Sequence, residues 1–203
     1  MCRFFVLLFF ASTVFAFSTY PDDEVSKKYE EAIISIGDKV AMELVGTLKK
    51  ELKRALSKGG PVGAVLVCSE RAQELTEQVS RSTGNGIDVK RTTFRYRNRK
   101  NAPDRYEALA LGYFEDLIKR GKDLPPYLIQ KVNLEGQVYY RYYKPIRVES
   151  FCLLCHGNPE SMQRELLEKL RELYPEDRAT GYSEGDFRGL VRVSIPESVL
   201  LSK

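Results

Sequence analysis

Residues 128–148 read LIQKVNLEGQVYYRYYKPIRV, and this stretch decides the fold. A short run, Leu128 to Val132, leads through Asn133-Leu134-Glu135-Gly136 into a longer aromatic run from Gln137 to Val148. Two such runs joined by a turn that contains Gly are typical of a β-hairpin. The sequence therefore predicts two antiparallel strands, at 128–132 and 137–148.

Helical periodicity precedes the hairpin. Between about 22 and 57, apolar residues recur at four-residue steps, which predicts one face of a long amphipathic N-terminal helix. Gly59-Gly60-Pro61 is expected to end this helix. The run 62–67 is expected to be buried and to deliver Cys68 to the start of a second helix, which reaches about Ser82.

The remaining segments complete an α+β pattern. Residues 87–97 alternate in two-residue steps and predict a strand, and a last strand is expected at 189–195. Helices are predicted over 103–119, where Asp104 and Glu107 have the spacing of a capping box, and over 161–174. This order predicts a mostly antiparallel sheet with flanking helices.

Directly after the hairpin stands Cys152-Leu153-Leu154-Cys155-His156, the attachment pattern for c-type haem. Two thiols about one helical turn apart can each form a thioether with one edge of the porphyrin, and the next residue presents its imidazole to the iron. We expect one covalent haem c per chain, attached through Cys152 and Cys155, with His156 as an axial ligand of the iron.

Three other chemistries fit parts of this motif. A thioredoxin-like dithiol needs a βαβ context, whereas this motif follows a hairpin strand. A structural disulfide leaves the position of His156 unexplained. A zinc site of Cys68, Cys152, Cys155 and His156 has the right number of ligands, but adjacent residues can hardly point at one tetrahedral centre. Zinc binding is kept as a remote alternative.

The second axial ligand must be another residue type, water or no ligand, because His156 is the only histidine. Met162 lies close after His156 and would have to wrap around the haem edge, while Met42 remains a candidate. Apart from Cys2 near the N-terminus, Cys68 is the one cysteine outside the haem motif. It follows a run expected to be buried and is expected at a helix N-terminus, which would favour the thiolate. The alternative is a buried free cysteine that packs as a small hydrophobe.

The predicted strand at 87–97 carries further candidate contacts. It would place Arg91, Arg95 and Arg97 on one face and Phe94 and Tyr96 on the other. Haem propionates are carboxylates, for which Arg is a bidentate partner. We treat these five residues as candidate cofactor contacts, against the alternative of a solvated basic strand face.

The N-terminus has the composition of a targeting segment. An apolar run from Phe4 to Phe17 ends near the small-residue cleavage pattern Val14-Phe15-Ala16. The run is shorter than the roughly 18 to 20 apolar residues of a spanning helix. We predict a signal peptide at 1–16 and a single exported domain at 17–203, in the periplasm or another extracytoplasmic space. Membrane attachment is expected only if the signal segment stays uncleaved.

Charge and motif content exclude two classes of function. The chain has 32 basic and 28 acidic residues, and its net charge of +4 gives no strong attraction to nucleic acid. The sequence shows no convincing pair of nucleophile and base and no Gly-rich phosphate loop. We therefore expect neither a nucleic-acid-binding protein nor an enzyme.

Several stretches together resemble a known family. They are Cys68-Ser69-Glu70-Arg71-Ala72, Arg97-Asn98-Arg99-Lys100-Asn101-Ala102-Pro103-Asp104, Tyr143-Lys144-Pro145-Ile146, the haem motif with Gly157-Asn158-Pro159, Tyr174-Pro175-Glu176-Asp177-Arg178-Ala179-Thr180-Gly181-Tyr182, and Gly185-Asp186-Phe187-Arg188-Gly189. In this order the chain resembles the extracytoplasmic c-haem domains of PAS-like fold, found free-standing or as input portions of membrane-bound signalling proteins. The resemblance implies a PAS-like sheet and a His/Cys-ligated haem, in which Cys68 matches the axial thiolate. Tyr106 stands where the family often has Trp.

Two functions are consistent with a haem that has two protein ligands, because such an iron has no open site for oxygen or peroxide chemistry. The first is a haem-based redox or gas sensor, in which electron uptake, CO or NO changes the ligation at Cys68. The second is a low-potential electron carrier. Either function needs a redox partner protein or a separate signalling partner, and the sequence leaves the oligomeric state open.

Overall fold

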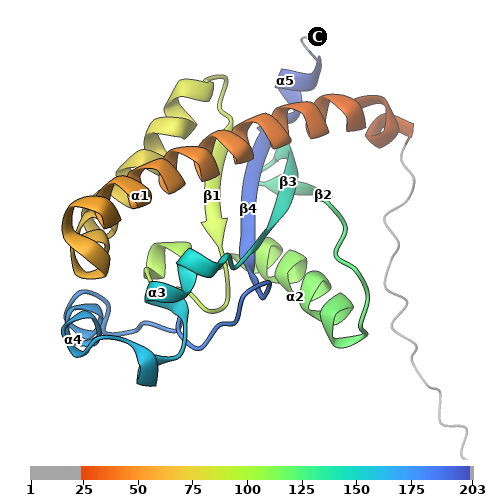
Figure 1. Ribbon diagram of the computed structural model, residues 1–203. Coiled ribbons are helices and arrows are strands. Elements are labelled where there is room, and N and C mark those ends of the chain that lie inside the picture. Colours follow the sequence, from red (N-terminus) through yellow and green to blue (C-terminus); the bar gives the residue numbers. More distant parts are fainter. Residues whose placement is uncertain (1–23, 202–203) are drawn as a thin grey trace, which may run out of the picture.

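The computed structural model describes residues 24–201, in which a four-stranded sheet has helices on both faces (Figure 1). The strands are β1 (Asp88–Thr92), β2 (Leu128–Leu134), β3 (Gln137–Arg147) and β4 (Phe187–Pro196). Their order in the sheet is β1-β4-β3-β2, and each neighbouring pair is antiparallel. The predicted α+β class with an antiparallel sheet is confirmed.

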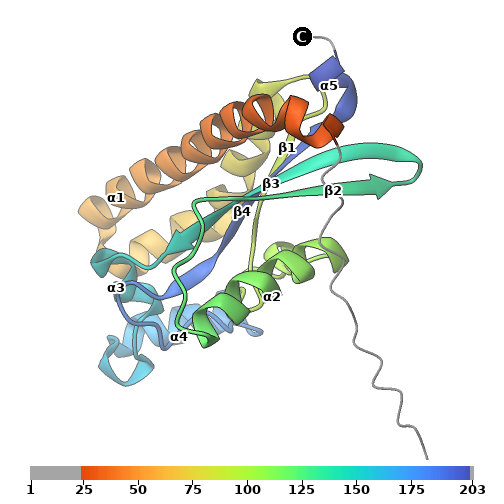
Figure 2. The ribbon, with the colours of Figure 1, turned by 90° about the vertical axis from the view of Figure 1, so that its right-hand side faces the viewer.

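The helices surround this sheet. They are α1 (Glu24–Thr83), α2 (Arg105–Lys119), α3 (Leu153–His156), α4 (Arg164–Leu173) and α5 (Glu197–Leu201), with short 3-10 turns η1 (Arg99–Asn101), η2 (Ser150–Cys152) and η3 (Pro159–Ser161). α1 lies over one face of the sheet and α2 over the other, while α3 and α4 gather at one end (Figure 2). This end, where α1 also passes, holds the cysteine motif.

The hairpin forms where the sequence predicts it. β2 pairs with β3 from Leu128 opposite Tyr143 to Leu134 opposite Gln137. The turn consists of Glu135 and Gly136, whose φ angles are 51° and 85°, and Asn133 Oδ1 accepts a hydrogen bond from the Gly136 amide at 3.0 Å. Because two residues with positive φ suffice for the turn, β2 is two residues longer than predicted.

The four-residue stripe of α1 has two uses. The stripe begins at Ile36, and its next members, Val40 and Leu44, are buried against Tyr140 and Tyr142 of the sheet. Gly37 allows this close packing, because a Cβ there would lie 2.2 Å from Tyr142 Cγ. The later members of the stripe line a cavity, and they are Leu48, Leu52 and Leu56. One amphipathic face thus anchors the helix and then forms part of a candidate site.

The break in α1 lies at the predicted glycines. Gly59 and Gly60 have non-helical dihedral angles, and the φ of +59° at Gly60 is accessible chiefly to glycine. The helix resumes at Pro61, a residue suited to a first helical position. Cys68 therefore lies about two turns inside the second half of α1, and the prediction that it begins a helix is wrong.

The strand predicted over 87–97 is also shorter than expected. Its pairing with β4 ends with Thr92 opposite Leu190, and β4 then reaches Gly189, where a Cβ would lie 2.5 Å from Thr92 O. Residues 93–98 leave the sheet, so the predicted alternation of faces along 91–97 does not exist. Arg91 is in β1, whereas Arg95 and Arg97 are in the following loop.

The opposite face of the sheet is held by a buried carboxylate. Glu107 of α2 is fully buried and accepts hydrogen bonds from Lys90 Nζ at 2.7 Å and from Arg192 Nε at 3.1 Å. It also accepts from the Asp104 amide at 3.0 Å, and Asp104 caps the helix in return. The predicted capping box is confirmed. Through Lys90 and Arg192, the Glu107 carboxylate also connects α2 to β1 and β4.

The predicted signal peptide at 1–16 lies outside the described residues. Among the helices that the structure does describe, none has the length and apolar character needed to cross a membrane.

Candidate functional site

A cavity of about 240 Å³ lies where α1, β1, α3 and the end of α4 meet. Its lining includes all four residues predicted to bind haem iron or its porphyrin: Cys68, Cys152, Cys155 and His156. Cys68 comes from α1, and the other three come from η2 and α3, more than 80 residues later. The fold therefore brings the leftover thiol to the motif.

The motif itself forms one turn of helix at the cavity. Cys152 ends η2, and α3 carries Cys155 and His156 before Gly157 ends it. Leu154 is 48% exposed and points away from the core. The thiols of Cys68, Cys152 and Cys155 are all free in the structure, and burial raises the pKa of the Cys155 thiol.

The imidazole of His156 is held in one orientation. Its Nδ1 lies 2.6 Å from the carbonyl oxygen of Ala179. Since a carbonyl can only accept, Nδ1 carries the proton and Nε2 keeps its lone pair. Burial, followed by the charges of Arg97 and Arg188, lowers the pKa of His156 well below its ordinary value. A neutral imidazole with a free Nε2 is the form that ligates a metal.

The segment that supports His156 is densely bonded. The Gly181 amide donates to Gly157 O at 2.7 Å, and the Tyr182 amide donates to His156 O at 3.0 Å. Tyr182 is buried and meets the imidazole edge to face, with ring centroids 6.3 Å apart. We call residues 155–157 and 177–182, together with Arg97, the His156 wall.

Arg97 joins the two parts of the His156 wall. Its Nε donates to Asp177 Oδ2 at 3.0 Å, and its Nη2 donates to Cys155 O at 2.6 Å and to Ala179 O at 3.4 Å. Asp177 Oδ1 in turn accepts from the Ala179 amide at 2.8 Å. The guanidinium is thus bound to the protein rather than directed at the cavity alone.

The side of the cavity that α1 forms is built differently. Leu48, Leu52, Leu56, Cys68 and Ala72 of α1 line it, and we call them the Cys68 wall. Within residues 24–201 no hydrogen bond to the Cys68 sulfur is found. Burial raises the pKa of the Cys68 thiol, and the charges of Arg91 and Arg97 oppose this shift. A helix N-terminus does not lower the pKa, contrary to the sequence-based expectation.

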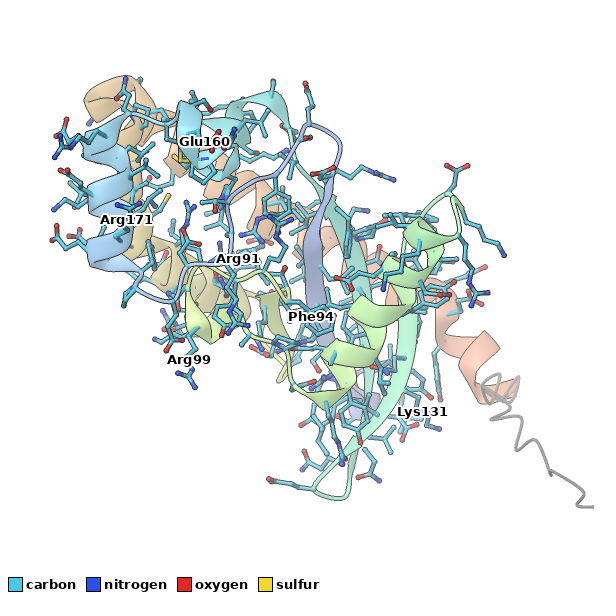
Figure 3. The ribbon with its side chains drawn as sticks, turned by 90° about the horizontal axis from the view of Figure 1, so that it is seen from below. Arg91, Phe94, Arg99, Lys131, Glu160 and Arg171 are labelled. Atoms are coloured by element: carbon cyan, nitrogen blue, oxygen red, sulfur yellow. The ribbon has the colours of Figure 1, made fainter. Side chains whose placement is uncertain are left out.

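Arg91 is a half-buried cation with a buried Nε that lacks a hydrogen-bond partner in the described structure. This Nε is inaccessible to solvent. Figure 3 shows the residue between the sheet and the α4 end, whereas Arg99 lies at the periphery. Burial lowers the pKa of Arg91, and the Cys68 thiol, when ionised, would raise it. A guanidinium with one buried, unpaired N–H calls for an anion.

The charges around the cavity support that conclusion. Four cationic side chains line it, and no Asp or Glu does; the cations are Lys49, Arg91, Arg97 and Arg188. Lys49 is paired with Glu149 and Arg97 with Asp177, both outside the lining. The surplus positive charge fits a group that carries carboxylates.

The residues therefore fit a haem by their donor chemistry. Two thiols, a neutral imidazole, a third thiol in the same cavity and a guanidinium with one unpaired N–H are the groups that a propionate-bearing, thioether-linked haem needs. At about 240 Å³ the cavity is smaller than the roughly 300–1,000 Å³ of typical ligand pockets. A tetrapyrrole would fill it and extend through its partly open side.

Three candidate residues lie apart from the cavity lining. Arg95 stacks on Tyr182, with its guanidinium carbon 3.8 Å from the ring centroid, and also bonds to the Thr180 carbonyl. Tyr96 stacks with Arg178 at 5.1 Å, and Phe94 is 37% exposed. The structure brings Arg91 and Arg97 to the site and places these three outside it.

Sequence reasoning missed several lining residues, and Tyr174 and Arg188 are two of them. Tyr174 follows the end of α4, and Arg188 is the second residue of β4. Both lie in stretches that carried the family resemblance, and that was the signal available. Their direction could not be predicted, because each comes from a loop end that only the folded sheet positions.

Zinc binding receives no support from the geometry. Within residues 24–201, no group of three or more His, Cys, Asp or Glu side chains is arranged to hold a metal ion. The four proposed zinc ligands share a cavity but do not converge on one point.

Comparison with known proteins gives two findings. Residues 12–196 match the model of the Tll0287-like family. Among solved structures, the chain is similar to the crystal structure of the cyanobacterial haem protein Tll0287, with a TM-score of 0.57 and 23% identity, over 84% of this chain and 96% of that one. At this identity the structural likeness shows a shared fold. No curated protein matches the chain.

Proposed function

The chain belongs to the Tll0287-like family, and from this premise we propose that it is an exported monohaem c-type cytochrome that acts as a redox or gas sensor. The observation that carries the proposal is the meeting of Cys152, Cys155 and His156 with Cys68 in one cavity. The haem named for the structural relative supports the same cofactor.

Each residue has a distinct role in this proposal. Cys152 and Cys155 form the thioether links, His156 ligates the iron through Nε2, and Cys68 ligates it from the opposite wall. Arg91 pairs with a propionate carboxylate. A bound haem supplies one-electron chemistry and an iron that can take CO or NO when a ligand leaves.

The contrast between the two walls favours sensing. The His156 wall is fixed by hydrogen bonds at 2.6–3.0 Å, whereas the Cys68 sulfur is held by its helix alone. Reduction of the iron weakens a thiolate bond, so Cys68 is the ligand expected to leave. A change of ligation at α1 would then be passed to a separate signalling partner.

A low-potential electron carrier is the second candidate function. Its supporting observation is the dense hydrogen bonding around His156, which suits a haem whose ligation is constant. In both cases we propose an extracytoplasmic location, from the composition of residues 1–16, and a protein partner rather than a catalysed reaction.

The test is to produce the chain together with a cytochrome c assembly apparatus. We expect a coloured protein whose mass exceeds the mature polypeptide by one haem, and a ferric EPR spectrum of low-spin iron with one imidazole and one thiolate ligand. A colourless protein of bare polypeptide mass would contradict the proposal, and stoichiometric zinc in that protein would favour the remote alternative.

Ferrous spectra separate the sensor from the carrier. Rapid uptake of CO or NO with loss of the thiolate supports sensing. An unchanged six-coordinate spectrum under CO, maintained over repeated redox cycles, supports electron transfer.

A further inference from the structure

We propose that Arg97 is the positioning residue for the iron ligand: it holds the Ala179 carbonyl that fixes the His156 imidazole. This inference rests on the proposed function, because it concerns how the haem ligand is oriented. It replaces the expectation that Arg97 binds a propionate.

The contacts of Arg97 form a closed set around Ala179. Asp177 receives a hydrogen bond from Arg97 Nε at 3.0 Å through one carboxylate oxygen and from the Ala179 amide at 2.8 Å through the other. Arg97 Nη2 donates to the Ala179 carbonyl at 3.4 Å, and that carbonyl accepts from His156 Nδ1 at 2.6 Å. Ala179 is thus held at both its amide and its carbonyl.

Arg97 also fixes the haem motif from its other side. The same Nη2 donates to Cys155 O at 2.6 Å, one residue before the imidazole. The guanidinium therefore sets the distance between the peptide that carries His156 and the peptide that accepts its Nδ1 proton. Few other residues could do this, because the fork of an Arg side chain presents several donors in one plane.

The burial of the pair explains why Arg97 is not free for a propionate. The side chains of Arg97 and Asp177 are each 12% exposed, so separating them would leave two charges poorly solvated. Arg91 has the unpartnered Nε instead. The two arginines that the sequence treated as equivalent have different tasks.

Two effects on the iron follow from this arrangement. The hydrogen bond to Ala179 O fixes the tautomer and the ring plane of His156. The positive charge of Arg97, close to the imidazole, disfavours added positive charge at the iron and so favours the ferrous state. Its contribution to lowering the His156 pKa is consistent with this proximity.

Arg95 offers a matched control. It also holds the 177–182 segment, through the carbonyls of Arg178 and Thr180 and by stacking on Tyr182. It contacts neither Ala179 O nor Cys155 O in the described structure. Arg95→Gln therefore removes a similar cation from the same loop without touching the carbonyl that orients His156.

The experiment compares haem-loaded wild type with Arg97→Gln, Arg97→Lys and Arg95→Gln. Because His156 is the only histidine, labelling with ¹⁵N-histidine gives the signals of a single imidazole in the diamagnetic, six-coordinate ferrous CO complex. We expect Arg97→Gln to lower the reduction potential, to change the ferric EPR g-values and to speed Nδ1–H exchange about tenfold. Arg95→Gln should leave all three unchanged.

Arg97→Lys separates charge from geometry. It keeps the positive charge, so the potential should stay near wild type, but it cannot bond Asp177 and both carbonyls at once, so the exchange should still be faster. If Arg97→Gln yields no loaded protein, Arg97→Lys carries the test through its exchange rate.

The inference is overturned if loaded Arg97 variants exchange Nδ1–H at the wild-type rate, or if Arg95→Gln shifts the three readouts as much as Arg97→Gln. A wild-type chain without covalent haem is a different result, since it contradicts the proposed function and not the hydrogen bonds of Arg97.

Discussion

The His156 wall and the Cys68 wall face the same cavity and are built on different principles. The His156 wall joins segments far apart in the sequence by side-chain and backbone hydrogen bonds, with Arg97 and Asp177 80 residues apart. The Cys68 wall is a set of side chains on one bent helix, α1, held by apolar packing. The difference teaches that one proposed ligand, His156, is fixed by a network, while the other, Cys68, depends on the position of a helix.

Such an asymmetry has a functional meaning. A ligand fixed by several hydrogen bonds resists displacement, because its departure leaves polar groups unpaired. A ligand fixed only by its helix leaves at lower cost and reports on that helix. If both residues ligate the iron as proposed, His156 would be the permanent ligand and Cys68 the ligand that leaves.

The strongest challenge to the His156 wall is removal of Tyr182. Its ring is buried, stacks with Arg95 and Arg188 and supports the imidazole. Tyr182→Ala should lower the free energy of unfolding by about 3–5 kcal/mol, as for other buried aromatic residues. Urea unfolding of the loaded protein measures this, with Tyr113→Ala on the exposed face of α2 as the control. A loss below about 1 kcal/mol would contradict a tightly built wall.

Cys68→Ser probes the other wall. The haem should remain attached, since both thioether residues are intact, while the ferric spectrum loses its thiolate features and the reduction potential rises. Ferric EPR and a redox titration give the result, and a spectrum identical to wild type would remove Cys68 from the iron.

Carbon monoxide tests which ligand leaves. In the ferrous protein, CO should displace Cys68 and leave the iron–imidazole bond in place, because Ala179 holds the His156 ring. Resonance Raman spectra identify the ligand opposite CO. Displacement of His156, with the sulfur retained, would reverse the comparison between the walls.

Acid should weaken the attachment of α1, with the smallest effect of the four. Asp38 accepts hydrogen bonds from Lys144 at 2.6 Å and from Tyr142 at 2.5 Å, and the bond from Lys144 is the main reason that the Asp38 pKa lies below 3.8. A depressed carboxyl pKa stabilises the fold above the unfolded pKa and loses this effect as pH falls through the folded pKa.

The variant Asp38→Asn isolates the contribution of the Asp38 charge to the free energy of unfolding. At pH 6 it should be less stable than wild type by less than about 1 kcal/mol, because the pair is half exposed. The difference should shrink as the pH is lowered through the Asp38 pKa. Urea midpoints at a series of pH values measure it, and a difference that grows on acidification would show that another group dominates.

The sequence predicts the elements of this fold better than their ends. The hairpin, the capping box of α2 and the glycine break of α1 each depend on local chemistry, and each is confirmed. The end of β1 depends on where its pairing with β4 stops, and β4 lies about 100 residues later in the sequence. For this reason the predicted alternation of side chains between two strand faces along 91–97 was wrong. Arg91, which lies within β1, does line the cavity.

The candidate site shows the same division. The Cys152–His156 motif is local and could be predicted directly, and Cys68 could be named as the cysteine left outside it, with support from the family resemblance. The role of Ala179 could not be predicted, because a backbone carbonyl has no residue-type signal. Arg97 and Asp177 are charged residues that could pair with many partners, and only the fold selects the pair.

The bend at Gly59 and Gly60 has a consequence for the order of folding. It turns α1 back so that Leu48, Leu52 and Leu56 meet Cys68 across a short stretch of chain, and such local contacts cost little loop-closure entropy. The contacts around His156 require the sheet to have assembled first. In a folding chain, the two halves of α1 should therefore pack together around Cys68 before the hydrogen bond between His156 and Ala179 forms.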